Sequence, residues 1–239
     1  MTLREMIDDS RRIVFFGGAG VSTESGISDF RSEDGLYRKQ YAYPPEQMLS
    51  RSFFMKHPEA FFAFYREQMM PMHAQPNDAH KALAALEKTG RLTAVITQNI
   101  DGLHQKAGSE HVLELHGSIW RNYCMKCGKF HDAAFVHDAP EAVPHCACGG
   151  VVKPDVVLYE EMLDDDVVKE AVSAIRAADM LIIAGTSMTV YPAAGLVQYF
   201  RGKHLALINR DVTPVDEMAG IVIRDRVGKV LSEVVDIKG

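Results

Sequence analysis

The stretch Ile13-Val-Phe-Phe16-Gly-Gly-Ala-Gly20, close to the amino terminus, decides the fold. Its run of apolar residues predicts a buried strand, and the glycines that follow allow a tight turn into the next element. Such a turn brings backbone N–H groups close enough to bind a phosphate. A dinucleotide fingerprint would also need a third glycine at position 23, where this chain has Thr23, and an acid about 20 residues further on. On these residues alone, phosphate binding and a turn without a ligand are about equally open.

Outward from this turn, apolar strands alternate with amphipathic helices. Strands are predicted at 92–97, 112–115, 156–159, 180–184, 205–208 and 221–223, and helices at 2–10, 58–68, 78–88, 165–177, 192–200 and from 228 onward. Residues 31–50 lack a period and contain Gly35, Pro44 and Pro45, so a loop is predicted there. The alternation is typical of an α/β fold with a doubly wound parallel sheet, in which ligands bind at the carboxyl ends of the strands.

The composition is that of a globular protein. Of the 239 residues, 47% are hydrophobic and 24% are charged, which is enough for a sizeable core. The net charge of −6 argues against direct binding of nucleic acid, since phosphate binding normally needs a basic surface. No apolar run is long enough to span a bilayer, and segment 2–10 lacks the apolar centre of a signal peptide. We therefore expect a cytoplasmic protein with no membrane partner.

The cysteines all lie in one short segment that interrupts the alternation. Cys124 and Cys127 form one pair, Cys146 and Cys148 form the other, and 18 residues separate the pairs, which resembles a zinc ribbon. Four thiolates complete a tetrahedral shell and leave no position for water, so the zinc would be structural. The second pair is one residue shorter than usual, which leaves open that His145 replaces a sulfur. Free buried cysteines are the alternative.

The motifs on these loops, taken together, resemble the sirtuin family of NAD-dependent protein deacylases. The matching motifs, in the order of that family, are Gly18-Ala-Gly-Val-Ser22, Gly26-Ile-Ser-Asp-Phe-Arg31, Thr97-Gln-Asn-Ile-Asp101, His116-Gly117, the cysteine pairs, Gly185-Thr-Ser187 and Asn209. They span nearly the whole chain, and their joint occurrence at this spacing is specific. The resemblance also accounts for the missing third glycine, because the phosphate loop of sirtuins differs from that of dehydrogenases.

The resemblance implies two domains with an NAD site between them. A Rossmann-like large domain would comprise residues 1–30, 76–118 and 156–239. A small domain would combine a helical insertion at 31–75 with the zinc ribbon at 119–155. NAD would be consumed as a co-substrate, one zinc ion would be structural, and the partners would be proteins or peptides that carry acyl-lysine.

The resemblance also implies roles for individual residues. Asn99 and Asp101 would hold the nicotinamide carboxamide and the ribose, and His116 would be the general base that activates a ribose hydroxyl. Phe30 would cover the ribose once nicotinamide has left, and Arg31 would pair with a cofactor phosphate. Further contacts to NAD are expected from Gly18, Ala19, Gly20, Ser22, Thr23, Ile27, Asp29, Gln98, Ile100, Gly185, Thr186, Ser187, Asn209, Asp225, Arg226 and Val227. Val156, Val157 and Leu158 would form an edge strand that pairs with the substrate peptide.

The acyl group is expected to be neutral. Sirtuins that prefer acidic acyl groups carry a Tyr-x-x-Arg pair, where this chain has Phe62-Ala-Phe-Tyr65. The adjacent Arg66 keeps the question open. The implied products are free lysine, nicotinamide and O-acyl-ADP-ribose.

Other functions are weighed against this one. Protein mono-ADP-ribosyl transfer needs the same cleavage of nicotinamide from NAD, so it is the nearest rival. A zinc-ribbon binding module without catalysis is a second rival, but its basic patch would be thin and it leaves the residues at the strand ends unexplained. A dehydrogenase is disfavoured by the missing third glycine and acid.

Overall fold

The computed structural model describes residues 1–29, 35–36 and 41–236. Its main sheet has six parallel strands in the order β3-β2-β1-β7-β8-β9. The strands are β1 (Ile13–Gly17), β2 (Leu92–Thr97), β3 (Val112–Glu114), β7 (Met180–Ala184), β8 (His204–Ile208) and β9 (Ile221–Ile223). The chain adds strands to one side of β1 and then to the other, so the order reverses between β1 and β7. Such a reversal opens a crevice at the carboxyl ends of the strands.

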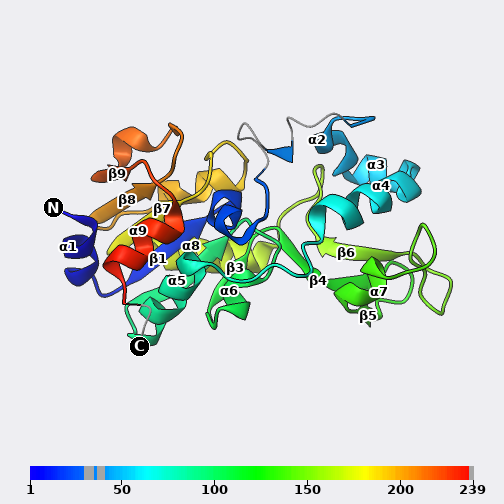
Figure 1. Ribbon diagram of the computed structural model, residues 1–239, viewed down its shortest axis with the longest axis horizontal. Coiled ribbons are helices and arrows are strands. Elements are labelled where there is room, and N and C mark those ends of the chain that lie inside the picture. Colours follow the sequence, from blue (N-terminus) through cyan, green and yellow to red (C-terminus); the bar gives the residue numbers. More distant parts are fainter. Residues whose placement is uncertain (30–34, 37–40, 237–239) are drawn as a thin grey trace.

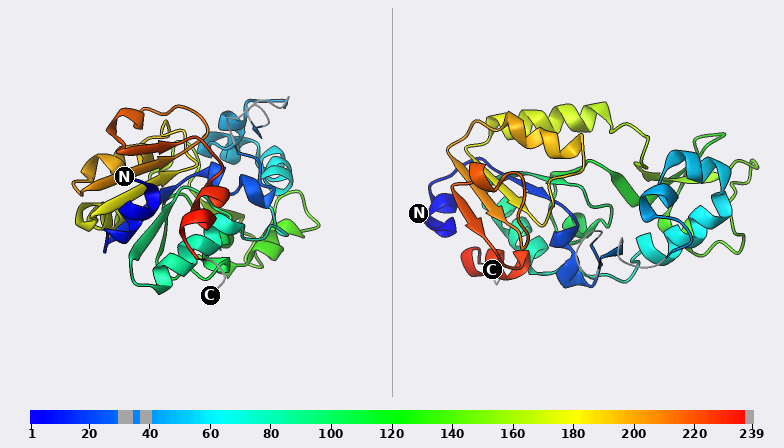
Figure 2. Two further views of the ribbon diagram at one scale, coloured as in Figure 1. Left: turned by 60° about the vertical axis from the view of Figure 1, so that its left-hand side comes forward. Right: turned by 90° about the horizontal axis from the view of Figure 1, so that it is seen from above.

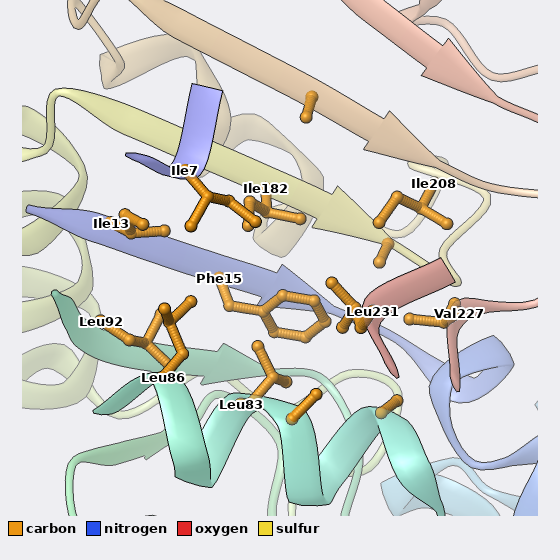
Figure 3. Close-up of a cluster of buried hydrophobic side chains, with 14 of the residues drawn as sticks. Ile7, Ile13, Phe15, Leu83, Leu86, Leu92, Ile182, Ile208, Val227 and Leu231 are labelled. Carbon is orange, nitrogen blue, oxygen red and sulfur yellow. The ribbon is translucent and has the colours of Figure 1, made fainter. Parts of the chain in front are cut away.

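Helices cover both faces of this sheet because its strands are apolar on both sides. One face packs against α1 (Leu3–Asp8), α5 (Asp78–Lys88) and α9 (Val227–Val234), and the other against α8 (Asp165–Ala177) and the 3₁₀ helix η5 (Ala193–Tyr199). In Figure 2 (right), α8 and α9 lie on opposite sides of the strands. Figure 3 shows the Phe15 ring of β1 with Leu83 of α5 and Leu231 of α9 nearby.

The amino-terminal ends of α1 and α5 are both capped by side chains. At α1 the side chain of Thr2 accepts a hydrogen bond from the N–H of Glu5, and Glu5 accepts one from Thr2, as a capping box requires. At α5 the cap is Asn77, and its side chain also donates to the carbonyl oxygen of Val21 at 2.8 Å. The start of α5 is therefore fastened to the turn that follows β1.

A second, three-stranded antiparallel sheet has the order β5-β4-β6. Its strands are β4 (Gly117–Cys124), β5 (Phe130–His131) and β6 (Val152–Val156), with α7 (Ala133–His137) beside them. It shares an apolar cluster with the segment α2 (Pro45–Met48), α3 (Arg51–Lys56), α4 (Pro58–Phe64) and the π-helical turn η4 (Tyr65–Met69). These elements lie together on the right of Figure 1, beside the main sheet.

Several predicted elements differ from the structure. The loop predicted over 31–50 contains α2, because Pro45 occupies the first turn of a helix, where its missing N–H is no loss. The strand predicted at 156–159 instead runs from Val152 to Val156, since its burial alternates along the strand and a search for apolar runs misses it. The helix predicted at 192–200 is η5, and β1 is followed by the short 3₁₀ turns η1 (Ala19–Val21) and η2 (Thr23–Ser25) rather than by an α-helix.

The remaining short elements are α6 (Leu103–Lys106) and the 3₁₀ turn η6 (Asp216–Met218). Within the described residues, every helix is too short or too polar to cross a bilayer.

Candidate active site

A cavity of ≈ 350 Å³ opens at the carboxyl ends of the main strands, beside the three-stranded sheet. The predicted site residues that line it are Gly18, Ala19, Gly20, Ser22, Thr23, Ile27, Asp29, Gln98, Asn99, Ile100, Asp101, His116, Val156, Val157, Leu158, Gly185, Thr186, Ser187, Asn209, Asp225, Arg226 and Val227. Two further predicted residues, Phe30 and Arg31, lie outside the described residues. Segments that are distant in the sequence thus meet around one cavity.

The glycines at the base of the cavity permit two backbone loops to touch. Gly20 donates its N–H to the carbonyl oxygen of Gly185 at 2.8 Å, and a Cβ on Gly20 would lie 2.8 Å from the Cα of Gly185. A Cβ on Gly18 would lie 2.8 Å from the Cβ of Thr186. Gly185 itself has φ +57°, in the left-handed region that favours glycine. The loops after β1 and β7 therefore need glycine for their close approach.

One buried network joins Ser22 to the two residues expected to hold nicotinamide. The Ser22 hydroxyl donates to Asp101 Oδ2 at 2.6 Å and accepts from Asn99 Nδ2 at 3.1 Å. The backbone N–H of Leu103 donates to Asp101 Oδ1 at 2.9 Å. Burial raises the pKa of Asp101, and the hydrogen bonds from Ser22 and Leu103 oppose that rise. Because the Asn99 amide N–H₂ is engaged, its Oδ1 can accept a hydrogen bond from a ligand.

His116 follows β3 and has a defined tautomer. Its Nδ1 lies 3.0 Å from the carbonyl oxygen of Gln98. A carbonyl oxygen only accepts, so Nδ1 carries the proton and Nε2 keeps a free lone pair. Burial lowers the pKa of His116, and the hydrogen bond to Gln98 acts in the opposite direction. The ring is therefore neutral at physiological pH and can take a proton at Nε2.

The segment after β6 forms the side of the cavity next to His116. Val157 donates its N–H to the carbonyl oxygen of His116 at 3.0 Å. β6 pairs with β4 alone among the described strands, and on its other edge the Val152 N–H donates to the carbonyl oxygen of Pro144 at 2.9 Å. The Leu158 N–H donates to Glu161 Oε2 at 2.9 Å, which fixes the turn that follows.

Part of the cavity wall consists of residues that were not predicted from the sequence. It includes the apolar side chains Leu36, Leu49, Met69 and Pro71, and also Gln68, Tyr191 and Arg210. Gln68 and Met69 belong to η4 and the others lie between the named elements, where apolar residues serve the core and the cavity alike. No pattern in the sequence separates the two uses.

Arg66 is directed away from this wall. Its guanidinium donates to the carbonyl oxygens of Val136, Glu141 and Ala142 at 2.8, 3.0 and 3.2 Å, respectively. Tyr65 is fully buried and stacks on Phe61, with ring centroids 5.5 Å apart. Neither side chain lines the cavity.

The four cysteines form a separate cluster. Their sulfur atoms all lie within 4.8 Å of one another, with Cys124 Sγ 3.4 Å from Cys148 Sγ and Cys127 Sγ 3.8 Å from Cys146 Sγ. Tetrahedral zinc with Zn–S bonds of about 2.3 Å places its sulfurs about 3.8 Å apart, so these residues fit zinc. The backbone N–H of Cys127 is the main cause that lowers the pKa of Cys124 to about 6, whereas the pKa of Cys127 is raised to about 11, since the lowering by the backbone N–H of Lys129 is outweighed by the neighbouring cysteine sulfurs together.

The shortened spacing of the second cysteine pair does not bring His145 into this cluster. Nδ1 of His145 lies 2.8 Å from the carbonyl oxygen of Val143. Gly150 closes the turn, and a Cβ there would lie 2.7 Å from Cys124 Sγ. The donor set is therefore four sulfurs, as a structural zinc site requires.

Comparison with known proteins agrees with this geometry. A profile of the Sir2 family matches residues 18–192. An NAD-dependent protein deacetylase of Clostridium acetobutylicum is 57% identical over 236 residues, which cover 98% of this chain and 96% of the relative. The NAD-dependent protein deacetylase of Staphylococcus aureus (strain N315) is 45% identical over 227 residues, covering 94% and 93%.

Solved structures give the same result. A Sir2 variant with a deacetylated p53 peptide and 3'-O-acetyl ADP-ribose has a TM-score of 0.90 and 37% identity, and the match covers 97% of this chain and 95% of that one. A complex of Sir2 with a p53 peptide and NAD+ has a TM-score of 0.86 and 38% identity, covering 98% and 97%. The chain belongs to the Sir2 family of NAD-dependent protein deacetylases.

Proposed function

We propose that the cavity binds NAD together with an acetylated lysine of a peptide or protein, and transfers the acetyl group to the ADP-ribose part of NAD. The reaction consumes one water molecule, and its products are nicotinamide, the free lysine side chain and O-acetyl-ADP-ribose. The observation that carries this proposal is the position of His116, a neutral base with its proton on Nδ1, in the same cavity as Asn99 and Asp101.

The nicotinamide end of the cavity is assigned to Ser22, Asn99 and Asp101. Asn99 Oδ1 accepts from the carboxamide or from a ribose hydroxyl, while Ser22 keeps the Asn99 amide and the Asp101 carboxylate in fixed orientations. The acyl oxygen attacks the ribose carbon that releases nicotinamide, and the reaction needs both groups held in line. The phosphates are assigned to the loops after β1 and β7 that line the cavity, Gly18–Gly20 and Gly185–Ser187.

The general base is assigned to His116. Its Nε2 takes the proton from a ribose hydroxyl, which then attacks the carbonyl carbon of the transferred acyl group. The hydrogen bond from Nδ1 to Gln98 holds the ring in the required tautomer and supports the imidazolium that forms.

The peptide is assigned to the side of the cavity formed by Val156–Leu158, and the acyl chain to the apolar wall of Leu49 and Met69. Because the Arg66 guanidinium is bound to three backbone carbonyls, it is not available for an acidic acyl group. The proposed preference is therefore for neutral acyl groups. The proposed domain division assigns 31–75 and 119–155 to the small domain and the remaining residues to the NAD-binding domain.

The test is nicotinamide release from NAD with and without an acetyl-lysine peptide, in the wild type and in His116→Ala. We expect peptide-dependent release that falls by about 10²- to 10⁴-fold in the variant, with an equal loss of deacetylation. His145→Ala is the matched control, because His145 lies outside both the cavity and the cysteine cluster. Release that does not depend on peptide would contradict the proposal.

Protein mono-ADP-ribosyl transfer is the second candidate, since it uses the same cleavage. Label from the adenylate part of NAD distinguishes the two reactions. It ends in free acetyl-ADP-ribose if the acetyl group is transferred, and on protein if ADP-ribose is transferred. A cytoplasmic location and the lack of nucleic-acid binding remain predictions from the sequence.

A further inference from the structure

Trp120, the only tryptophan of the chain, binds the loop that carries the proposed nicotinamide residues. Its indole Nε1–H donates to the backbone carbonyl oxygen of Asp101 at 2.8 Å. One residue earlier, the N–H of Ile119 donates to the carbonyl oxygen of Ile100 at 3.0 Å. Strand β4 thus holds two successive carbonyls of this loop from the side of the three-stranded sheet.

An irregularity in β4 makes this contact possible. Gly117 and Ser118 pair with Val156 and Asp155 of β6, and pairing resumes only at Asn122. The residues between Ser118 and Asn122, Trp120 among them, lie in a break of the register. Such bulges re-aim side chains near functional sites. The indole of Trp120 therefore reaches the loop Asn99–Asp101 from a segment of β4 that is not itself paired with β6.

Gly102 is fitted to the indole. It has φ +70°, and a Cβ there would lie 2.6 Å from Trp120 Nε1 and 2.7 Å from its Cδ1. The glycine allows the indole to approach the backbone, and it also allows the chain to turn into α6. The Leu103 N–H then donates to Asp101 Oδ1, so both the backbone and the side chain of Asp101 are fixed.

We propose that Trp120 is a positioning residue for Asp101: its indole N–H fixes the loop Asn99–Asp101 in the orientation that receives the nicotinamide end of NAD. This inference rests on the proposed function, because it takes that loop to be the nicotinamide site. Trp120 does not line the cavity, so it acts through Asp101 and not by touching the substrate.

The variant Trp120→Phe tests the inference, because it keeps an aromatic ring and removes the donor. We expect the KM for NAD and the inhibition constant of nicotinamide both to rise by about five-fold, the factor of one ordinary hydrogen bond. The KM for the acetyl-peptide stays within about two-fold, since the peptide edge lies on the other side of the register break. Tyr123→Phe is the matched control, because it also removes a polar group from a half-exposed aromatic residue of β4.

A purely structural role would lower the melting temperature and change both KM values together, and that result would overturn the inference. If the wild type is active and Trp120→Phe has the same kinetic constants, the inference is also overturned, while the proposed function stays intact. A wild type without peptide-dependent nicotinamide release would instead refute the proposed function. In that case the emission of Trp120 during titration with NAD still tests the positioning role: a change supports it, and no change counts against it.

Discussion

Acidification is expected to destabilise the protein through a buried histidine outside the cavity. His80 lies at the third position of α5, is fully buried, and accepts a hydrogen bond at Nδ1 from the N–H of Asn77 at 3.3 Å. Among the described residues its Nε2 has no hydrogen-bond partner. Burial lowers the pKa of His80 to about 4. The ring of His104 lies 4.7 Å away, and burial followed by the charge of His80 lowers its pKa well below the ordinary value.

The sign and size of the effect follow from proton binding. In the unfolded chain the pKa of a histidine is near 6.5, so that state binds a proton at a pH where folded His80 does not. The contribution of His80 to stability is complete above pH 6.5 and is lost as the pH falls towards about 4. The full pKa shift of His80 corresponds to about 3.4 kcal/mol of unfolding free energy, of which about 2 kcal/mol is lost by about pH 5.

The assay is urea unfolding at about pH 7.5 and about pH 5, for the wild type and for His80→Gln. Glutamine at this helix position keeps an acceptor for the Asn77 N–H but does not titrate. Titratable groups distant from His80, including the cysteines, cancel in the comparison. The wild type should lose about 2 kcal/mol more than the variant. Equal losses in the two proteins would refute the reasoning.

Four further outcomes are expected. Since burial lowers the pKa of His116, the acid limb of kcat/KM should lie below pH 6.5, and this limb should disappear in His116→Ala; a limb at higher pH would contradict the assignment. Cys146→Ser, or treatment with a chelator, should release one zinc ion and abolish activity, as measured by metal analysis and nicotinamide release. Gly20→Ala should raise the KM for NAD, because its Cβ would meet the backbone of Gly185 at 2.8 Å; an unchanged KM would show that the loops can separate at no cost. Acetyl-lysine should be removed faster than succinyl-lysine from matched peptides, and the opposite order would show that a cation other than Arg66 reaches the acyl group.

The fold was largely predictable because its main sheet is buried on both faces. Strands such as Met180–Ala184 appear in the sequence as continuous apolar runs, and α8 was predicted with its observed limits. The small sheet was not predictable in the same way. β6 reads Val152-Lys-Pro-Asp-Val156, with polar residues alternating and a proline on an edge strand. Its formation depends on its antiparallel partner β4, which lies far away in the sequence.

The site residues were predictable only where a motif carried them. Those residues lie at the ends of strands, and the parallel sheet brings the strand ends together. No motif in the sequence indicates that Ser22 joins Asn99 to Asp101, or that the Nδ1 of His116 donates to the carbonyl oxygen of Gln98. These contacts join residues that are 18 to 79 positions apart in the sequence. No local sequence pattern indicates how close such residues lie in space.

Strand β4 also links the metal cluster to the proposed chemistry. It begins directly after His116 and ends at Cys124, so a proposed zinc ligand and the proposed general base lie at opposite ends of one strand of about 26 Å. Between them, Ile119 and Trp120 hold the carbonyls of Ile100 and Asp101. A zinc ion with a complete sulfur shell does no chemistry itself, but it can order the strand from which the nicotinamide loop is held. If so, metal removal should weaken the binding of nicotinamide and of NAD before it unfolds the main sheet, whose two apolar clusters do not include the cysteines.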